Sequence, residues 1–157
     1  MVRLLTLLLL IPFLTVGQSI TSTEVSGQSN IYNDALIQYI KHLDNSGVKY
    51  DTLYLSNQPE VVTDSLMTII GSTLIKVVNE NEGELSEILS KKEGIVYHYL
   101  FPLSFHNNQF YVSILPLGAK KEKGEIRLLN SGGGRAVYSF DQQKKQFKFI
   151  KYESWGI

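Results

Sequence analysis

The hydrophobic pattern changes its period along the chain, and this change restricts the fold more than any other feature. From Ile31 to Leu43, apolar residues recur every three or four positions, which predicts an amphipathic helix. From Ile95 to Phe149, apolar and polar residues alternate, which is typical of half-buried strands. Short polar stretches such as 142–145 separate the alternating runs, so these strands should form an antiparallel meander.

Four further elements are predicted between these two regions. Tyr50–Leu55 and Thr73–Val78 have the composition of strands. Between them, a short helical turn should run from Thr63 or Asp64 through Ile70 and end at Gly71. Glu82–Lys92 should form a second helix, because its glutamates come early and its lysines late, as the helix macrodipole favours.

The resulting fold class is α+β, with the N-terminal amphipathic helix packed on a mostly antiparallel, curved meander sheet. This order of a helix followed by a curved sheet is similar in layout to the cystatin-like and NTF2-like architectures. The resemblance concerns layout alone, and it implies no particular activity.

The N-terminus has the pattern of a secretory signal. Arg3 precedes an apolar run, Leu4–Val16, and small residues follow around Gly17. The run is shorter than the roughly 20 residues that a membrane-spanning helix needs. We therefore expect a signal peptide over 1–17, a flexible leader over 18–28 and a single domain over 29–157. The mature chain should be exported to the periplasm or the extracellular space, with no membrane anchor after cleavage.

Composition excludes several classes of function. The chain has no cysteine, so disulfides, thiolate catalysis and cysteine-ligated zinc are all excluded. Lysine plus arginine equals aspartate plus glutamate at 15 each, and a chain with no basic excess is a poor candidate for binding nucleic acid.

A run of glycines precedes Arg135. The N–H groups of Gly132, Gly133 and Gly134, with the Arg135 guanidinium, have the chemistry to bind a phosphate or a carboxylate. A phosphate-binding loop, however, leads into a helix and carries a lysine, whereas a strand follows here. We expect a flexible connection between strands and retain these four residues as candidate binding residues.

The three histidines are His42, His98 and His106, and none has a partner at the spacing that would present two metal ligands together. We therefore predict no metal site and no cofactor. His98 lies among the polar positions of its strand, and imidazole titrates near neutral pH. It is the single candidate for a general base, and a surface histidine is the simpler expectation.

Tyrosines recur along the predicted strands. Tyr97, Tyr99 and Tyr111 would be well placed to stack on a ligand if they share an open sheet face. Aromatic residues also favour strands for packing alone. We name these three as candidate ligand-binding residues, with core packing as the alternative.

Together these features favour an exported, non-catalytic binding or interaction module, a monomer or weak dimer whose ligand is a protein or a small molecule. One alternative is a small periplasmic enzyme with a pocket between the first helix and the sheet, where His98 and a carboxylate act as acid–base groups. Another is an inhibitor of a partner enzyme, which requires a protruding loop such as 118–124 or 130–135.

Overall fold

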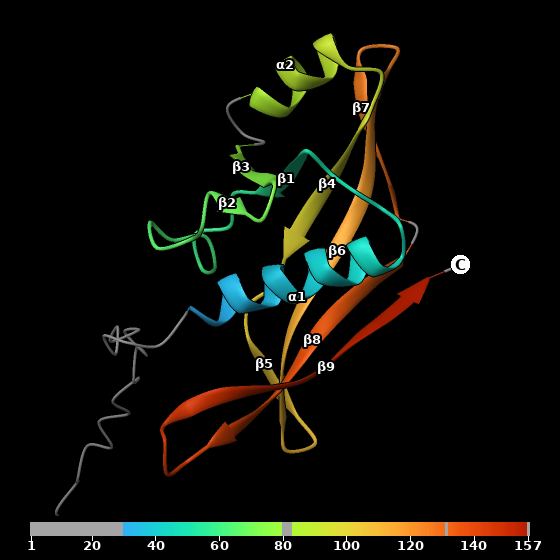
Figure 1. The fold of residues 1–157 in the computed structure, drawn as a ribbon. Coiled ribbons are helices and arrows are strands. Elements are labelled where there is room, and N and C mark those ends of the chain that lie inside the picture. The colour runs from blue at the N-terminus through green and yellow to red at the C-terminus, as the bar shows by residue number, and fades with distance from the viewer. Residues whose placement is uncertain (1–29, 80–82, 131, 157) are drawn as a thin grey trace, which may run out of the picture.

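The computed structural model describes residues 30–79, 83–130 and 132–156. The predicted signal peptide over 1–17 and leader over 18–28 lie outside the described residues. Within the described residues, two helices and nine strands form an α+β fold with a curved sheet (Figure 1). No helix of the described chain is long and apolar enough to cross a membrane.

The helices are α1 (Ile31–Asn45) and α2 (Glu84–Lys91). The strands, in chain order, are β1 (Thr52–Ser56), β2 (Ile69–Ile70), β3 (Thr73–Val78), β4 (Ile95–Leu100), β5 (Ser104–His106), β6 (Gln109–Glu122), β7 (Glu125–Asn130), β8 (Gly132–Asp141) and β9 (Gln146–Gly156). These bounds confirm the first helix and the strand over 73–78.

The sheet is mostly antiparallel, as predicted. Its strand order is β2-β3-β1-β4-β6-β8-β9, and β5 and β7 both pair with β6. The exceptions are β1–β3 and β1–β4, which pair in parallel, so the sheet is not a simple meander. Parallel neighbours need a long crossover, and α2 lies in the connection between β3 and β4.

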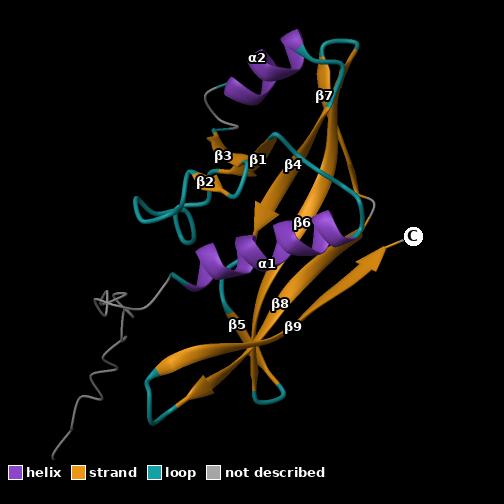
Figure 2. Ribbon diagram, viewed as in Figure 1, coloured by secondary structure: helices purple, strands orange, loops and turns teal. Residues whose placement is uncertain are grey.

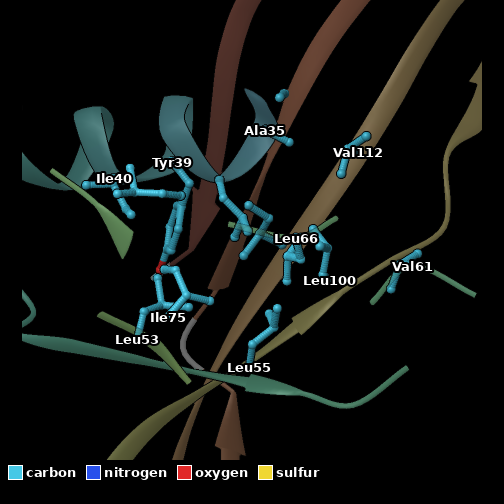
Figure 3. Close-up of a cluster of buried hydrophobic side chains, with 14 of the residues drawn as sticks. Ala35, Tyr39, Ile40, Leu53, Leu55, Val61, Leu66, Ile75, Leu100 and Val112 are labelled. Atoms are coloured by element: carbon cyan, nitrogen blue, oxygen red, sulfur yellow. The ribbon is translucent and has the colours of Figure 1, made fainter. Parts of the chain in front are cut away.

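The first helix packs on one face of the sheet, where it crosses β6 and β8 (Figure 2). The side chain of Asn30 caps it by accepting a hydrogen bond of 2.9 Å from the Tyr32 N–H. Its buried residues pack against strand residues such as Leu53 and Ile75, and Figure 3 shows Tyr39 pointing toward them. This contact forms the main hydrophobic core.

The second helix packs on the opposite face. Leu85 and Leu89 of α2 cluster with Tyr97 of β4 and Ala119 of β6. Tyr97 is three residues from Leu100 of the main core, and side chains alternate along a strand, so the two clusters occupy opposite faces. At β4, therefore, α1 covers one face of the sheet and α2 covers the other.

Several predicted loops are strands. Most of 118–124 belongs to β6, and only Lys123 and Gly124 form the turn into β7. Of the segment 130–135, Asn130 ends β7 and residues 132–135 belong to β8, and both strands pair with β6. The short β5 and β2 were not predicted, and β2 occupies the end of the expected helical turn before Gly71.

Candidate binding face of the sheet

One face of the sheet is covered by α1, while α2 covers only one end of the other. We call the remaining part of that second face the open face. The strand registers place its residues in rows: Tyr99 lies beside Leu115, Gly133 beside Trp155, and Ser113 beside Arg135 and then Glu153.

Trp155 lies directly over the glycine run. A Cβ atom on Gly133 would lie 2.8 Å from Cζ2 of the Trp155 indole, which is closer than real Cβ atoms approach other atoms. The missing side chain therefore makes room for the indole against the backbone of β8. Trp155 is still 49% exposed, so one side of this large ring remains available at the surface.

Arg135 is held in a fixed position on the open face. Its Nε donates a hydrogen bond of 2.6 Å to Oε2 of Glu153, and its guanidinium carbon lies 4.5 Å from the centre of the Tyr111 ring. Lys151 also contacts Glu153, at 2.7 Å. Hydrogen bonds from Lys151 and Arg135 hold the pKa of the Glu153 carboxyl below its usual range. The face therefore combines ordered charges with aromatic rings.

Exposed apolar side chains continue this surface. Phe101, whose N–H donates to Ser113, is 41% exposed. On β7, Leu128 lies beside Ala119 of the α2-covered cluster, and Ile126 is two residues away on the same face. These exposed side chains add apolar surface on the same side of the sheet as Trp155.

The structure brings four of the seven candidate binding residues together. Tyr99, Tyr111, Gly133 and Arg135 all lie on the open face, although the Tyr111 ring is buried beneath Arg135. Tyr97 points to the same side of the sheet but is completely buried beneath α2.

The other two glycines have structural reasons to lack a side chain. Gly132 has a φ of 133°, and a Cβ there would collide with the backbone oxygen of Trp155. A Cβ on Gly134 would collide with the Tyr152 hydroxyl on the α1 side. The expectation of a flexible connection is therefore wrong, because these glycines form part of β8 and let two aromatic side chains of β9 pack on it.

Two residues of the open face, Glu153 and Trp155, were not among the predicted site residues. Their signal is present in the sequence, because Lys151, Glu153 and Trp155 alternate on one side of a strand. The meaning of that alternation depends on Arg135 and Gly133 being their neighbours across the sheet, which the sequence does not show.

His98 lies on the α1 side of the sheet and is fully buried, contrary to the expectation of a surface histidine. Its Nδ1 lies 3.1 Å from the Tyr54 carbonyl oxygen, and its Nε2 lies 3.0 Å from the Tyr39 hydroxyl. A carbonyl only accepts hydrogen bonds, so Nδ1 carries the proton and Nε2 accepts from Tyr39. Burial lowers the pKa of His98 to about 4.

More rings surround this histidine. Tyr39 and Tyr50 contact it edge-on, with ring centres 5.5 and 5.7 Å away, and Tyr152 lies 6.1 Å beyond Tyr39. The buried hydroxyl of Tyr152 has no hydrogen-bond partner among the described residues. In this arrangement the imidazole is neutral at pH 7 and has no exposed surface.

A groove of about 340 Å³ lies between α1 and the β2–β3 turn. Apolar side chains such as Ile40 and Met67 line it, with Lys41 and Asp44 at the helix side. His98 is not among its lining residues.

No group of three or more histidine, aspartate or glutamate side chains in the described ranges could hold a metal ion. No protein-family model matches the chain, and no curated protein or solved structure is significantly similar to it. Its function must therefore be argued from the geometry of the chain itself.

Proposed function

We propose that the chain is an exported, non-catalytic interaction module that binds a protein partner through its open sheet face. The observation that carries this proposal is the exposed Trp155 indole, which is seated on Gly133 beside the ordered pair of Arg135 and Glu153. The proposed export rests on the N-terminal signal pattern over 1–17.

The composition of the face supports a protein partner. Tryptophan, tyrosine and arginine are the residues most often found at the energetic centres of protein interfaces. Here Trp155 and Arg135 occur together, with the buried Tyr111 ring beneath Arg135, and Phe101 and Leu128 add exposed apolar surface. Monomeric proteins seldom leave large contiguous apolar patches uncovered.

The order of these side chains also supports binding. Arg135 is restrained by Glu153 on one side and by the Tyr111 ring on the other, so little conformational entropy remains to be lost when a partner binds. A helix-on-curved-sheet layout similar to the cystatin-like and NTF2-like architectures would suit this role, because it leaves one sheet face uncovered.

Site-specific photo-crosslinking tests the proposal. The photoreactive residue p-benzoylphenylalanine would replace Phe101 on the open face, and in a separate variant it would replace Gln143, an exposed residue of the β8–β9 turn. Both full-length variants would be expressed and irradiated in the cells from which the chain originates. We expect one discrete adduct from position 101 and none from position 143.

Two further variants connect the adduct to the proposed contacts. Trp155→Ala and Arg135→Ala, each combined with the crosslinker at position 101, should remove the adduct, while Lys144→Ala in the distant turn should leave it unchanged. Equal adducts from both crosslinker positions, or an adduct that persists without Trp155, would contradict binding through this face.

A further inference from the structure

The strand β7 is paired along one edge only. Its inner edge pairs with β6 from Glu122↔Glu125 to Leu117↔Asn130, and no residue of the described chain pairs with its outer edge. We infer that this outer edge binds an extended segment of a partner protein, which adds a strand to the sheet. The inference rests on the proposed function and deepens it by naming the form in which the partner binds.

The backbone of β7 directs hydrogen-bonding groups outward. Lys123 and Gly124 have φ values of 51° and 87°, as in the two-residue type I′ turn of a β-hairpin. The residues that flank such a turn form a hydrogen-bonded pair, and the pattern then alternates along the ladder. The N–H and C=O groups of Ile126, Leu128 and Asn130 therefore point away from β6.

The side chains of this edge are unusually apolar for their exposure. Every residue of β7 is exposed, and Ile126, Leu128 and Leu129 are 38%, 41% and 57% exposed. Side chains alternate along a strand, so Ile126 and Leu128 lie on the same side of the sheet as α2, and Leu129 lies on the other side. An added strand would find an apolar neighbour on each face of the sheet.

The other outer edge on this side of β6, which belongs to β9, is protected. On β9, the register shifts between Val137 and Tyr138, so Ile150 is an extra, bulged residue. Lys148 and Lys151 also lie on that strand. Bulges and lysines are the usual means of preventing edge-to-edge pairing. β7 has neither a lysine, a proline nor a bulge.

A second copy of the chain is a poor occupant of this edge. When two copies pair antiparallel, side chains of the same face lie opposite each other. The central residue of the pairing, Arg127 or Leu128, then pairs with the same residue of the second copy. The first register opposes two Arg127 side chains, and the second opposes Arg127 to Leu129. Neither is complementary. The occupant that fits is a segment of a different protein with apolar residues at alternate positions.

A strand-forming peptide provides a defined probe. We would label an acetylated heptapeptide of alternating valine and threonine with a fluorophore and titrate it with the mature chain by fluorescence anisotropy. We expect saturable binding. The same peptide with alternate backbone nitrogens methylated cannot donate along one edge, and it should bind at least about tenfold more weakly, which corresponds to about 1.4 kcal/mol.

Proline scanning of the protein isolates the edge. Leu128→Pro removes an outward N–H while leaving the bonds to β6, and it should weaken binding at least about tenfold. Leu128→Val, which keeps the N–H and an apolar side chain, should bind as the unchanged protein does. Circular dichroism and thermal melting would establish that each variant is folded. If Leu128→Pro does not fold, Ile126→Pro replaces it, because it also removes an outward N–H.

The possible outcomes separate the two proposals. Edge pairing would be overturned if the unchanged protein did not bind the peptide, or if the proline variants or the methylated peptide bound equally well. The crosslink from position 101 would then remain as the independent test of the open face. A dimer in light scattering that Leu128→Pro abolishes would assign the edge to a second copy and overturn the partner stated here.

Discussion

Acidification should destabilise the fold through His98. The pKa of this buried imidazole is lowered from 6.5 to about 4 because burial disfavours its charged form. The unfolded chain therefore binds a proton more readily than the folded chain between these two pH values, and stability must fall as pH falls. Each pKa unit corresponds to about 1.36 kcal/mol, so the full loss is about 3 kcal/mol. It is complete near pH 4 and absent above about pH 7.

The assay is urea unfolding at closely spaced pH values from 4 to 8. His98→Leu should lower the free energy of unfolding at pH 7, because it removes the hydrogen bonds of the imidazole with the Tyr39 hydroxyl and the Tyr54 carbonyl. Its stability should nevertheless depend less on pH than that of the unchanged protein, by about 3 kcal/mol between pH 7 and pH 4. His106→Gln, at the exposed end of β5, is the matched control and should retain the full dependence.

A direct titration removes any dependence on the folding of the variant. The imidazole resonances of His98 in the unchanged protein should show a midpoint near pH 4. A midpoint near 6.5, or identical pH profiles for the unchanged protein and His98→Leu, would refute the reasoning. Either result would mean that water reaches this histidine.

Three further substitutions test the packing, each by urea unfolding. Gly134→Ala should destabilise the fold by about 1–3 kcal/mol, because its Cβ would collide with the Tyr152 hydroxyl; no change would mean that β9 shifts freely. Tyr138→Phe removes a 2.9 Å hydrogen bond to Asp34 and should cost about 1.5 kcal/mol, and a neutral result would contradict that bond. Asn30→Ala removes the cap of α1 and should cost about 1 kcal/mol, unless the helix begins elsewhere.

The elements that depend on local pattern could be predicted from the sequence. The stripe of Ala35, Leu36, Tyr39 and Ile40 predicted α1 and its buried side, because helical spacing alone determines which residues share a face. The alternating runs after Ile95 predicted most of the antiparallel strands for the same reason.

Long-range pairing could not be predicted in this way. The parallel contact of β1 with β3 and β4 depends on where the chain returns after a crossover, and nothing local records this. The polar chemistry of His98 predicts an exposed position on its strand. However, its strand is central and covered by α1 on one face and α2 on the other, so side chains on both faces are buried.

The glycine run shows the same limit at the candidate site. Three successive glycines are typical of a loop when viewed alone. They form a strand here because Trp155 and Tyr152 of β9 occupy the space above them, on opposite faces of the sheet. The pairing of β8 with β9 therefore determines both the structure of the run and the exposure of the indole.

The most direct test of binding through the open face uses the emission of Trp155. It is the only tryptophan of the chain, and it is half exposed, so its fluorescence reports on this face alone. The partner captured through position 101 would be purified and added to the chain that lacks residues 1–17, with iodide as the quencher. We predict a shift of the emission to shorter wavelength and a clear fall in quenching. A complex whose tryptophan emission and quenching equal those of the free chain would contradict the proposal.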